Sequence, residues 1–138
     1  MKEQELSFRL TGIEILQSEI VELTTKLNPS IEFHFDISIE VKLNEEEETV
    51  FVAPLVKIRI NEIPEYVGKL KIALAFNIKS IQKHLNKNSK GTLPKDIQDL
   101  LNSISISTLR GVMFNHFKGT YLHNAILPVI DPKSFSID

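Results

Sequence analysis

The sequence predicts an α+β domain in which a long-stranded antiparallel sheet of about four strands carries C-terminal helices packed on one face. Residues 31–43 alternate apolar and polar side chains without exception. Residues 49–60 and 69–79 repeat the alternation, and a helical pattern begins near Pro94. Because side chains alternate between the two faces of a strand, this patterning indicates a sheet with one apolar and one polar face. Only the apolar face then needs a covering layer.

Composition narrows the class of protein. The chain has 138 residues, which suits a single domain spanning 1–138. Its 16 basic and 18 acidic residues give a net charge of −2, which argues against nucleic-acid binding. Cysteine is absent, so disulfides and thiolate metal sites are excluded. We expect no signal peptide and no membrane insertion, because no apolar run approaches the roughly 20 residues that a membrane helix needs. A cytoplasmic protein is predicted.

The first segment supports two interpretations. Apolar residues alternate from Leu6 to Leu10, and the alternation resumes out of phase at Ile13, just after Gly12. One inserted residue beside a glycine indicates a β-bulge. From Ile13 onward a helix also fits, since apolar residues recur at spacings of three and four. We favour a strand with a break near Gln17.

The central strands carry three further predictions. The acidic run 45–48 is interpreted as a solvated hairpin tip, because consecutive carboxylates diverge, unlike the spaced ligands of a calcium loop. Pro54 lacks a backbone N–H and indicates an edge strand or a bulge. Phe51 and Leu55 place apolar groups on the polar face, so we expect something to cover part of that face.

Two helices and an extended tail are predicted after the sheet. A short helix over 80–88 is indicated by apolar residues four apart, with Ser80 as its cap. A longer helix begins near Pro94, with acidic residues in its first turn and an apolar side. The tail 119–138 is apolar but contains prolines. It should therefore cover hydrophobic surface as an extended segment.

No catalytic residue, cofactor or metal site is predicted. His34 and Asp36 lie two residues apart on the polar face, with Ser38 next, but a flat strand offers no pocket for catalysis. His116 and His123 match no zinc-binding spacing. The phosphate-binding patterns GxGxxG and GxxxxGK(S/T) do not occur. Binding is therefore the better interpretation than catalysis.

The C-terminal third contains three elements in a characteristic order. An amphipathic helix ending in residues 107–111 is followed by residues 118–122 and then by residues 126–132. This order resembles the C-terminal signature of the SecB family of protein-export chaperones and its divergent SecB-like relatives, in which a helix ending in an Arg-Gly step leads to a Gly-Thr-aromatic element and a Leu-x-Pro-Val segment. The intervening residues 112–118 make the match more similar to the SecB-like branch.

The resemblance implies an ATP-independent molecular chaperone that binds unfolded or non-native polypeptides in apolar grooves between sheet and helices. It also implies a homotetramer built as a dimer of dimers. SecB-like relatives serve export or toxin–antitoxin systems, so the client is expected to be an exported protein or an aggregation-prone antitoxin. Docking to the export motor is not expected, because only six residues follow Pro132. Apolar side chains cluster within the signature, and the predicted client groove or subunit interface comprises Phe114, Phe117, Tyr121, Leu122, Ile126 and Leu127.

A second hypothesis belongs to another class of protein. A half-open sheet with a helical lid could bind a small hydrophobic ligand, without catalytic activity and as a monomer. Mass in solution distinguishes the two hypotheses, since the chaperone is expected to be a tetramer.

Overall fold

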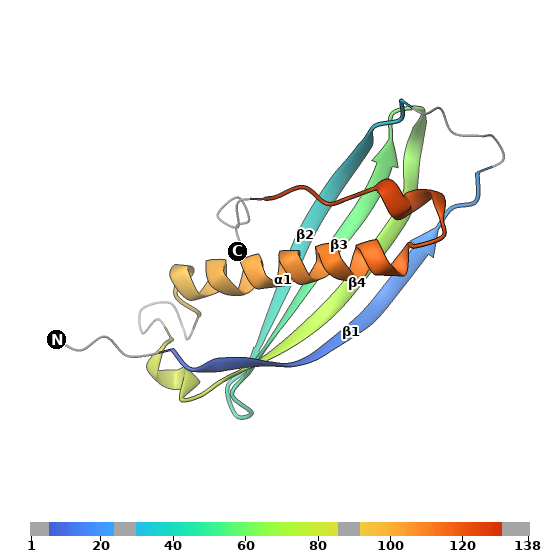
Figure 1. Cartoon of the computed structure of the whole chain (residues 1–138). Coiled ribbons are helices and arrows are strands. Elements are labelled where there is room, and N and C mark those ends of the chain that lie inside the picture. Colours follow the sequence, from blue (N-terminus) through green and yellow to red (C-terminus); the bar gives the residue numbers. More distant parts are fainter. Residues whose placement is uncertain (1–5, 24–29, 86–91, 131–138) are drawn as a thin grey trace.

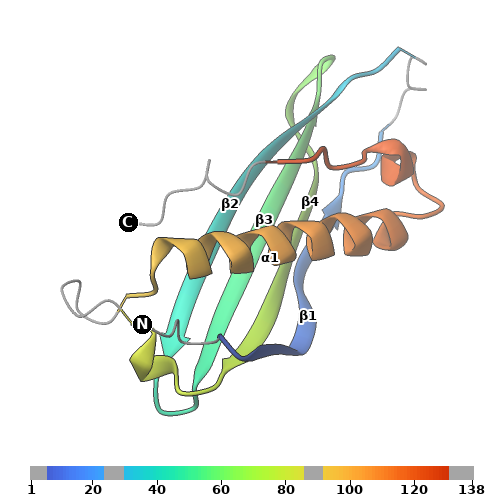
Figure 2. The same ribbon diagram turned by 60° about the vertical axis from the view of Figure 1, so that its left-hand side comes forward.

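One antiparallel sheet and one long helix make up the fold. The computed structural model describes residues 6–23, 30–85 and 92–130. The sheet has the strand order β1-β4-β3-β2, and α1 crosses one of its faces, here called the helix face (Figures 1 and 2). The predicted α+β architecture is thereby confirmed. The elements are β1 (Phe8–Ile20), β2 (Phe33–Asn44), β3 (Thr49–Ile60), β4 (Ile63–Ile78), the 3-10 turn η1 (Ile81–Lys83), α1 (Lys95–His116) and the 3-10 turn η2 (Tyr121–Asn124).

The core lies between α1 and the two central strands. Alternate residues of β3 and β4, such as Val56 and Phe76, are completely buried on the helix face, and Leu101 and Leu109 of α1 are buried with them. Each such side chain contributes roughly 1.5–3 kcal/mol by leaving water. The opposite face, here called the open face, carries no element of the described chain (Figure 2). No helix in this part of the chain is long and apolar enough to cross a membrane.

β1 is a strand with two bulges. Its pairing with β4 shifts between Leu10 and Gly12 and again between Ile15 and Gln17. The first shift confirms the predicted bulge, and the second occurs where we expected a break. The strand interpretation is therefore correct and the helical one is wrong up to Ile20. The residues Asn28, Pro29 and Ser30 also predict a turn, most of which lies outside the described residues.

Pro54 was expected at an edge or a bulge, and both expectations are wrong. It lies in the interior strand β3, opposite Ile39 of β2, in a ladder without register shifts. On the other side, the paired positions of β3 and β4 pass from Val52 directly to Leu55. The sheet accommodates the missing N–H of Pro54 because β3 and β4 have no paired positions at residues 53 and 54 of β3.

The helices differ in length from the predictions. The short helix over 80–88 is only the single turn η1, with Ile81 buried, and residues 86–91 lie outside the described residues. The long helix does not end at Gly111 but continues to His116. Met113 and Phe117 extend its buried side beyond the glycine, which explains the continuation. Two polar side chains, Asn102 and Ser105, are fully buried on this helix.

The acidic run forms the tight β2–β3 connection, as predicted. Glu48 has a left-handed backbone conformation (φ 51°), and its carboxylate oxygen Oε2 accepts a hydrogen bond of 2.5 Å from the Ser80 backbone N–H. The Asn77 side chain donates to the Glu48 carbonyl oxygen at 3.2 Å. The hairpin tip is therefore fastened to the end of β4.

Candidate functional site

Both edge strands of the sheet carry apolar side chains on the helix face. β1 and β2 each pair with one neighbouring strand, so among the described residues the outer edge of each presents backbone N–H and C=O groups without a strand partner. α1 contacts mainly β3 and β4 among the strands, which leaves the edge strands only partly covered. An apolar face beside an open backbone edge can bind a further extended chain.

The surface on β2, here called the β2 strip, is straight and regular. Its side chains on the helix face are half-buried, whereas the alternate side chains on the open face are exposed. The pairing with β3 is in register from Phe33 opposite Ile60 to Asn44 opposite Thr49. The predicted alternation is thus present, but the apolar side chains of β2 are only half-buried, whereas those of a fully covered sheet would be buried. The strip consists of Phe33, Phe35, Ile37, Ile39, Val41 and Leu43.

The surface on β1, here called the β1 strip, is more exposed and less regular. Leu10, Ile13 and Ile15 retain 41%, 45% and 48% of their accessible surface. Their partners in β4 are core residues, so these side chains extend the core surface outward on the helix face. The two bulges divide the outer edge into short pieces. Side-chain packing suits this edge better than continuous strand addition.

A segment after η2 runs back across the helix face (Figure 1). Ala125 and Leu127 are buried against the sheet, whereas Ile126 between them is 56% exposed. The Arg110 side chain of α1 fixes this segment, because its Nε donates to the Leu127 carbonyl oxygen and its Nη2 to that of Pro128, both at 2.7 Å. Residues 125–130 therefore cover hydrophobic surface outside any helix or strand, as predicted, whereas residues 121–124 of the predicted extended tail form the 3-10 turn η2 instead. Residues 131–138 lie outside the described residues.

The six predicted site residues comprise three core residues, two exposed residues and the half-buried Tyr121. Phe117, Leu122 and Leu127 are core residues with at most 1% of their surface exposed. Phe114 and Ile126 are exposed. The Phe114 ring packs on the His123 ring, with 4.7 Å between centroids.

Tyr121, the sixth residue, fastens η2 to the sheet. Its hydroxyl group contacts the carbonyl oxygens of Val21 and Val67. Burial raises the pKa of Tyr121 above its ordinary value. The neighbouring Leu122 packs over Gly68, where a Cβ atom would come within 2.5 Å of the leucine Cδ1. These contacts give Tyr121 and Leu122 a structural role.

His34 and Asp36, which the sequence places two residues apart on the polar face, do not form a pair in the structure. The Asp36 carboxylate pairs with Arg59 at 2.8 Å on the open face, rather than with His34. This hydrogen bond, with a further one from Tyr66, lowers the pKa of Asp36. Among the described residues no three His, Cys, Asp or Glu side chains are grouped to hold a metal ion.

One serine–histidine contact was not anticipated from the sequence. Ser18 Oγ lies 2.6 Å from His116 Nε2, joining β1 to the end of α1. No carboxylate in the described chain forms an ion pair with this histidine. The contact therefore lacks the third member that orients a catalytic histidine, and it anchors the helix on the strand. Spacing alone could not reveal it, because 98 residues separate the two side chains.

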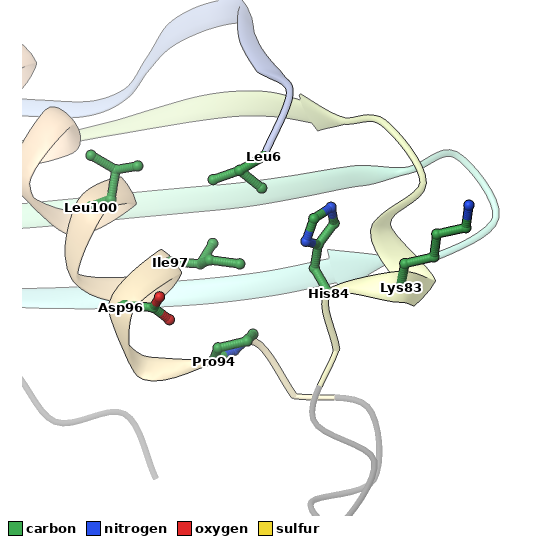
Figure 3. A pocket seen from close by; sticks show the side chains of 7 residues that line it. All are labelled: Leu6, Lys83, His84, Pro94, Asp96, Ile97 and Leu100. Atoms are coloured by element: carbon green, nitrogen blue, oxygen red, sulfur yellow. The ribbon is translucent and has the colours of Figure 1, made fainter. Parts of the chain in front are cut away.

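A cavity of about 360 Å³ lies at the beginning of α1 (Figure 3). Leu6, Ile97 and Leu100 supply apolar walls, and the His84 ring and Ile97 point toward one another across it. Lys83 and Asp96 add opposite charges to the lining. Its mixed lining does not resemble the predominantly apolar pocket that a hydrophobic ligand needs.

The edge strips were missed as a site because the sequence shows which residues are apolar but not which strands the helix covers. The alternation of 31–43 was the available signal for the β2 strip. For the β1 strip the out-of-phase apolar residues around Gly12 were the signal, although they were read only as a bulge.

Taken together, the geometry defines a sheet-and-helix domain with two partly uncovered apolar edge strands. Its fold is SecB-like. The structure of the Mycobacterium tuberculosis Rv1957 SecB-like chaperone, in complex with a ChAD peptide from the Rv1956 HigA1 antitoxin, is similar with a TM-score of 0.62. The match covers 89% of this chain and 90% of that one, at 11% sequence identity.

Other comparisons add little. A Streptococcus agalactiae protein of unknown function aligns over 93% of this chain and 98% of its own, at 10% identity and a TM-score of 0.40. No protein-family model matches the sequence. No curated protein matches it either.

Proposed function

We propose that this protein is an ATP-independent molecular chaperone that binds extended segments of unfolded or non-native polypeptides. The observation that carries the proposal is the β2 strip, where half-buried aromatic and aliphatic side chains lie beside an open, unbulged backbone edge. A client strand can pair with this edge through main-chain hydrogen bonds and place alternate apolar side chains on the helix face. The SecB-like neighbour, which is in complex with an antitoxin peptide, supports the proposal that the ligand is a polypeptide.

Within this proposal the described residues take different roles. Phe35, near the middle of the β2 strip, contacts the client, and the exposed Phe114 and Ile126 are retained as further contacts. The buried members of the predicted set, such as Phe117, shape the surface from below. The chaperone acts in the cytoplasm, on exported proteins or on an antitoxin.

The same proposal includes self-association through the β1 strip. Leu10, Ile13 and Ile15 form an exposed apolar surface on an edge strand, and burying such a surface between two copies is favourable. A dimer of dimers would have four times the chain mass of 15.7 kDa. Ile13→Asp changes an exposed side chain, so it should leave the fold intact and reduce the mass measured by light scattering. An unchanged mass would remove the β1 strip from the interface.

Client binding is tested with a matched pair of aromatic substitutions. Phe35→Ser removes an aromatic side chain from the β2 strip, whereas Phe51→Ser removes one that is 39% exposed on the open face of the adjacent strand. At most about a third of the Phe35 surface, roughly 70 Å², is left for a client to cover, so losing this contact should weaken client binding by up to about tenfold. Phe51→Ser should bind as the wild type does.

The assay measures aggregation of a chemically unfolded client at stoichiometric chaperone, together with a client-peptide affinity. Failure of the wild-type protein to suppress aggregation of any client would overturn the chaperone proposal. Equal affinities for the wild type and Phe35→Ser would instead keep the chaperone and move its binding surface away from the β2 strip.

The small-ligand hypothesis is not carried forward as a second function. The cavity at the beginning of α1 has a mixed lining. A second cavity, at the tip of the β2–β3 hairpin, is lined by acidic side chains such as Glu45 and Glu48. Neither observation favours an apolar ligand.

A further inference from the structure

A second surface, unrelated to the apolar strips, lies at the corner of the sheet where β1 begins and β4 ends. Arg9 is opposite Asn77 in the β1–β4 ladder, and the Lys79 backbone N–H donates to the Ser7 carbonyl oxygen at 3.0 Å. Because alternate residues share a face, all four side chains project on the open face. They line a recess of about 300 Å³ together with Phe8.

The two cations of this corner have no counter-charge among the residues that the structure describes. Arg9 and Lys79 are exposed, and no carboxylate in the described residues forms an ion pair with either one. Three other cations on this face, Arg59, Lys69 and Lys71, are each paired with a carboxylate. Lys57 lies over the Tyr66 ring, and Lys42 on β2 is a single exposed cation without an ion pair in the described residues. Arg9 and Lys79 are diagonal neighbours on adjacent strands, roughly 7–8 Å apart at the backbone. They repel one another unless an anion lies between them.

Glu48, which contacts the end of β4 beside this corner, is already engaged. Glu48 directs its Oε2 to the Ser80 backbone N–H, and its carbonyl oxygen accepts one hydrogen of the Asn77 amide group. An amide nitrogen has two hydrogens, so Asn77 retains a second donor. The Ser7 hydroxyl adds another. Two long cationic side chains and two short neutral donors thus surround one recess on a hydrogen-bonded sheet corner.

We propose that this corner, formed by Ser7, Arg9, Asn77 and Lys79, is a binding site for a small oxyanion with at least two coordinating oxygens. Arginine and lysine both bind phosphate, the first as a planar fork and the second as a point charge. A doubly charged phosphate matches the two cations in charge. A carboxylate group shares the same donor chemistry with one charge fewer. The site does not depend on the chaperone proposal.

The test is a titration of the whole chain with inorganic phosphate, followed by backbone amide NMR. Sodium chloride is exchanged for phosphate so that ionic strength stays at about 0.15 M. The expected result is saturable shifts confined to the amides of residues 7–9 and 77–79. A parallel titration with acetate identifies the source, because binding of acetate with equal affinity assigns a carboxylate ligand and weaker binding assigns phosphate.

Three variants make the test decisive. Arg9→Gln and Lys79→Gln each remove one charge without removing an internal contact, and each should weaken phosphate binding about tenfold or more. Lys42→Gln is the matched control, since Lys42 is an exposed cation on the open face of the other edge strand. It should leave the affinity unchanged. The proposal is overturned if shifts increase linearly without saturation, or if both corner variants bind phosphate as the wild type does.

Discussion

Arg110 controls how tightly the C-terminal segment lies on the sheet. Its guanidinium donates two hydrogen bonds of 2.7 Å to the carbonyl oxygens of Leu127 and Pro128. Hydrogen bonds from charged donors contribute about 1.5–3 kcal/mol each, and two bonds from one partly exposed side chain are not additive. We therefore expect Arg110→Met, which keeps the apolar stem, to cost about 2–3 kcal/mol of unfolding free energy. For a chain of this length that corresponds to a fall of roughly 6–12 °C in Tm.

The assay combines thermal unfolding with amide hydrogen exchange. Exchange should increase most at residues 125–130, because these residues lose their anchor while the central strands keep their packing. The exchange rates and the Tm of Arg110→Lys should lie between those of the wild type and Arg110→Met, since a single ammonium group cannot reproduce both hydrogen bonds in the same geometry. The reasoning is refuted if residues 125–130 exchange at wild-type rates in Arg110→Met, whatever happens to Tm.

Two further predictions concern stability. Gly68→Ala should destabilise the fold by about 1–3 kcal/mol, because the added Cβ would come within 2.5 Å of the buried Leu122 side chain. Gly111→Ala should instead stabilise α1 by about 0.5–1 kcal/mol, because a Cβ added there meets nothing within 4 Å. Urea unfolding measures the change in unfolding free energy of both variants. Changes of the same sign in Gly68→Ala and Gly111→Ala would contradict the packing argument. The pKa of Asp36 is lowered by Arg59, so this pair adds stability above the ordinary carboxyl pKa of 3.8 that disappears as pH falls through the folded-state pKa. The stability difference between wild type and Asp36→Asn should thus be present at neutral pH and absent in strong acid, and a difference that persists in acid would contradict it.

Periodicity predicted the strands well because it reports a local property. The faultless alternation of 31–43 and the phase change at Gly12 both depend on neighbouring residues, and both appear in the structure as expected. The register of the sheet gave no such signal. Pro54 illustrates this point. An interior strand can contain this proline only because of which positions of β3 are paired with β2 and which with β4.

The candidate site was harder to predict because it depends on coverage. Phe117 and Ile126 are both apolar and lie within one sequence motif, yet one is fully buried and the other is 56% exposed. Which of them contacts solvent is decided by the path of the segment after η2 and by Arg110, 16 residues upstream of Ile126 in the sequence. Contacts across such distances leave no local pattern. The same holds for the β2 strip, whose exposure follows from the position of α1.

The strand order also sets the sequence of events during synthesis. Phe8 is paired with Ile78, so β1 has no partner until 70 further residues have been translated. β2 needs only the adjacent hairpin strand, whereas the exposed apolar residues of β1 wait for β4 and then for α1. Pairings between distant parts of a chain form slowly. During synthesis β1 therefore exposes its apolar residues before its partner strand exists and is protected only after β4 has been made. Residues 8–20 are then themselves an extended apolar segment of the kind that the proposed activity would bind.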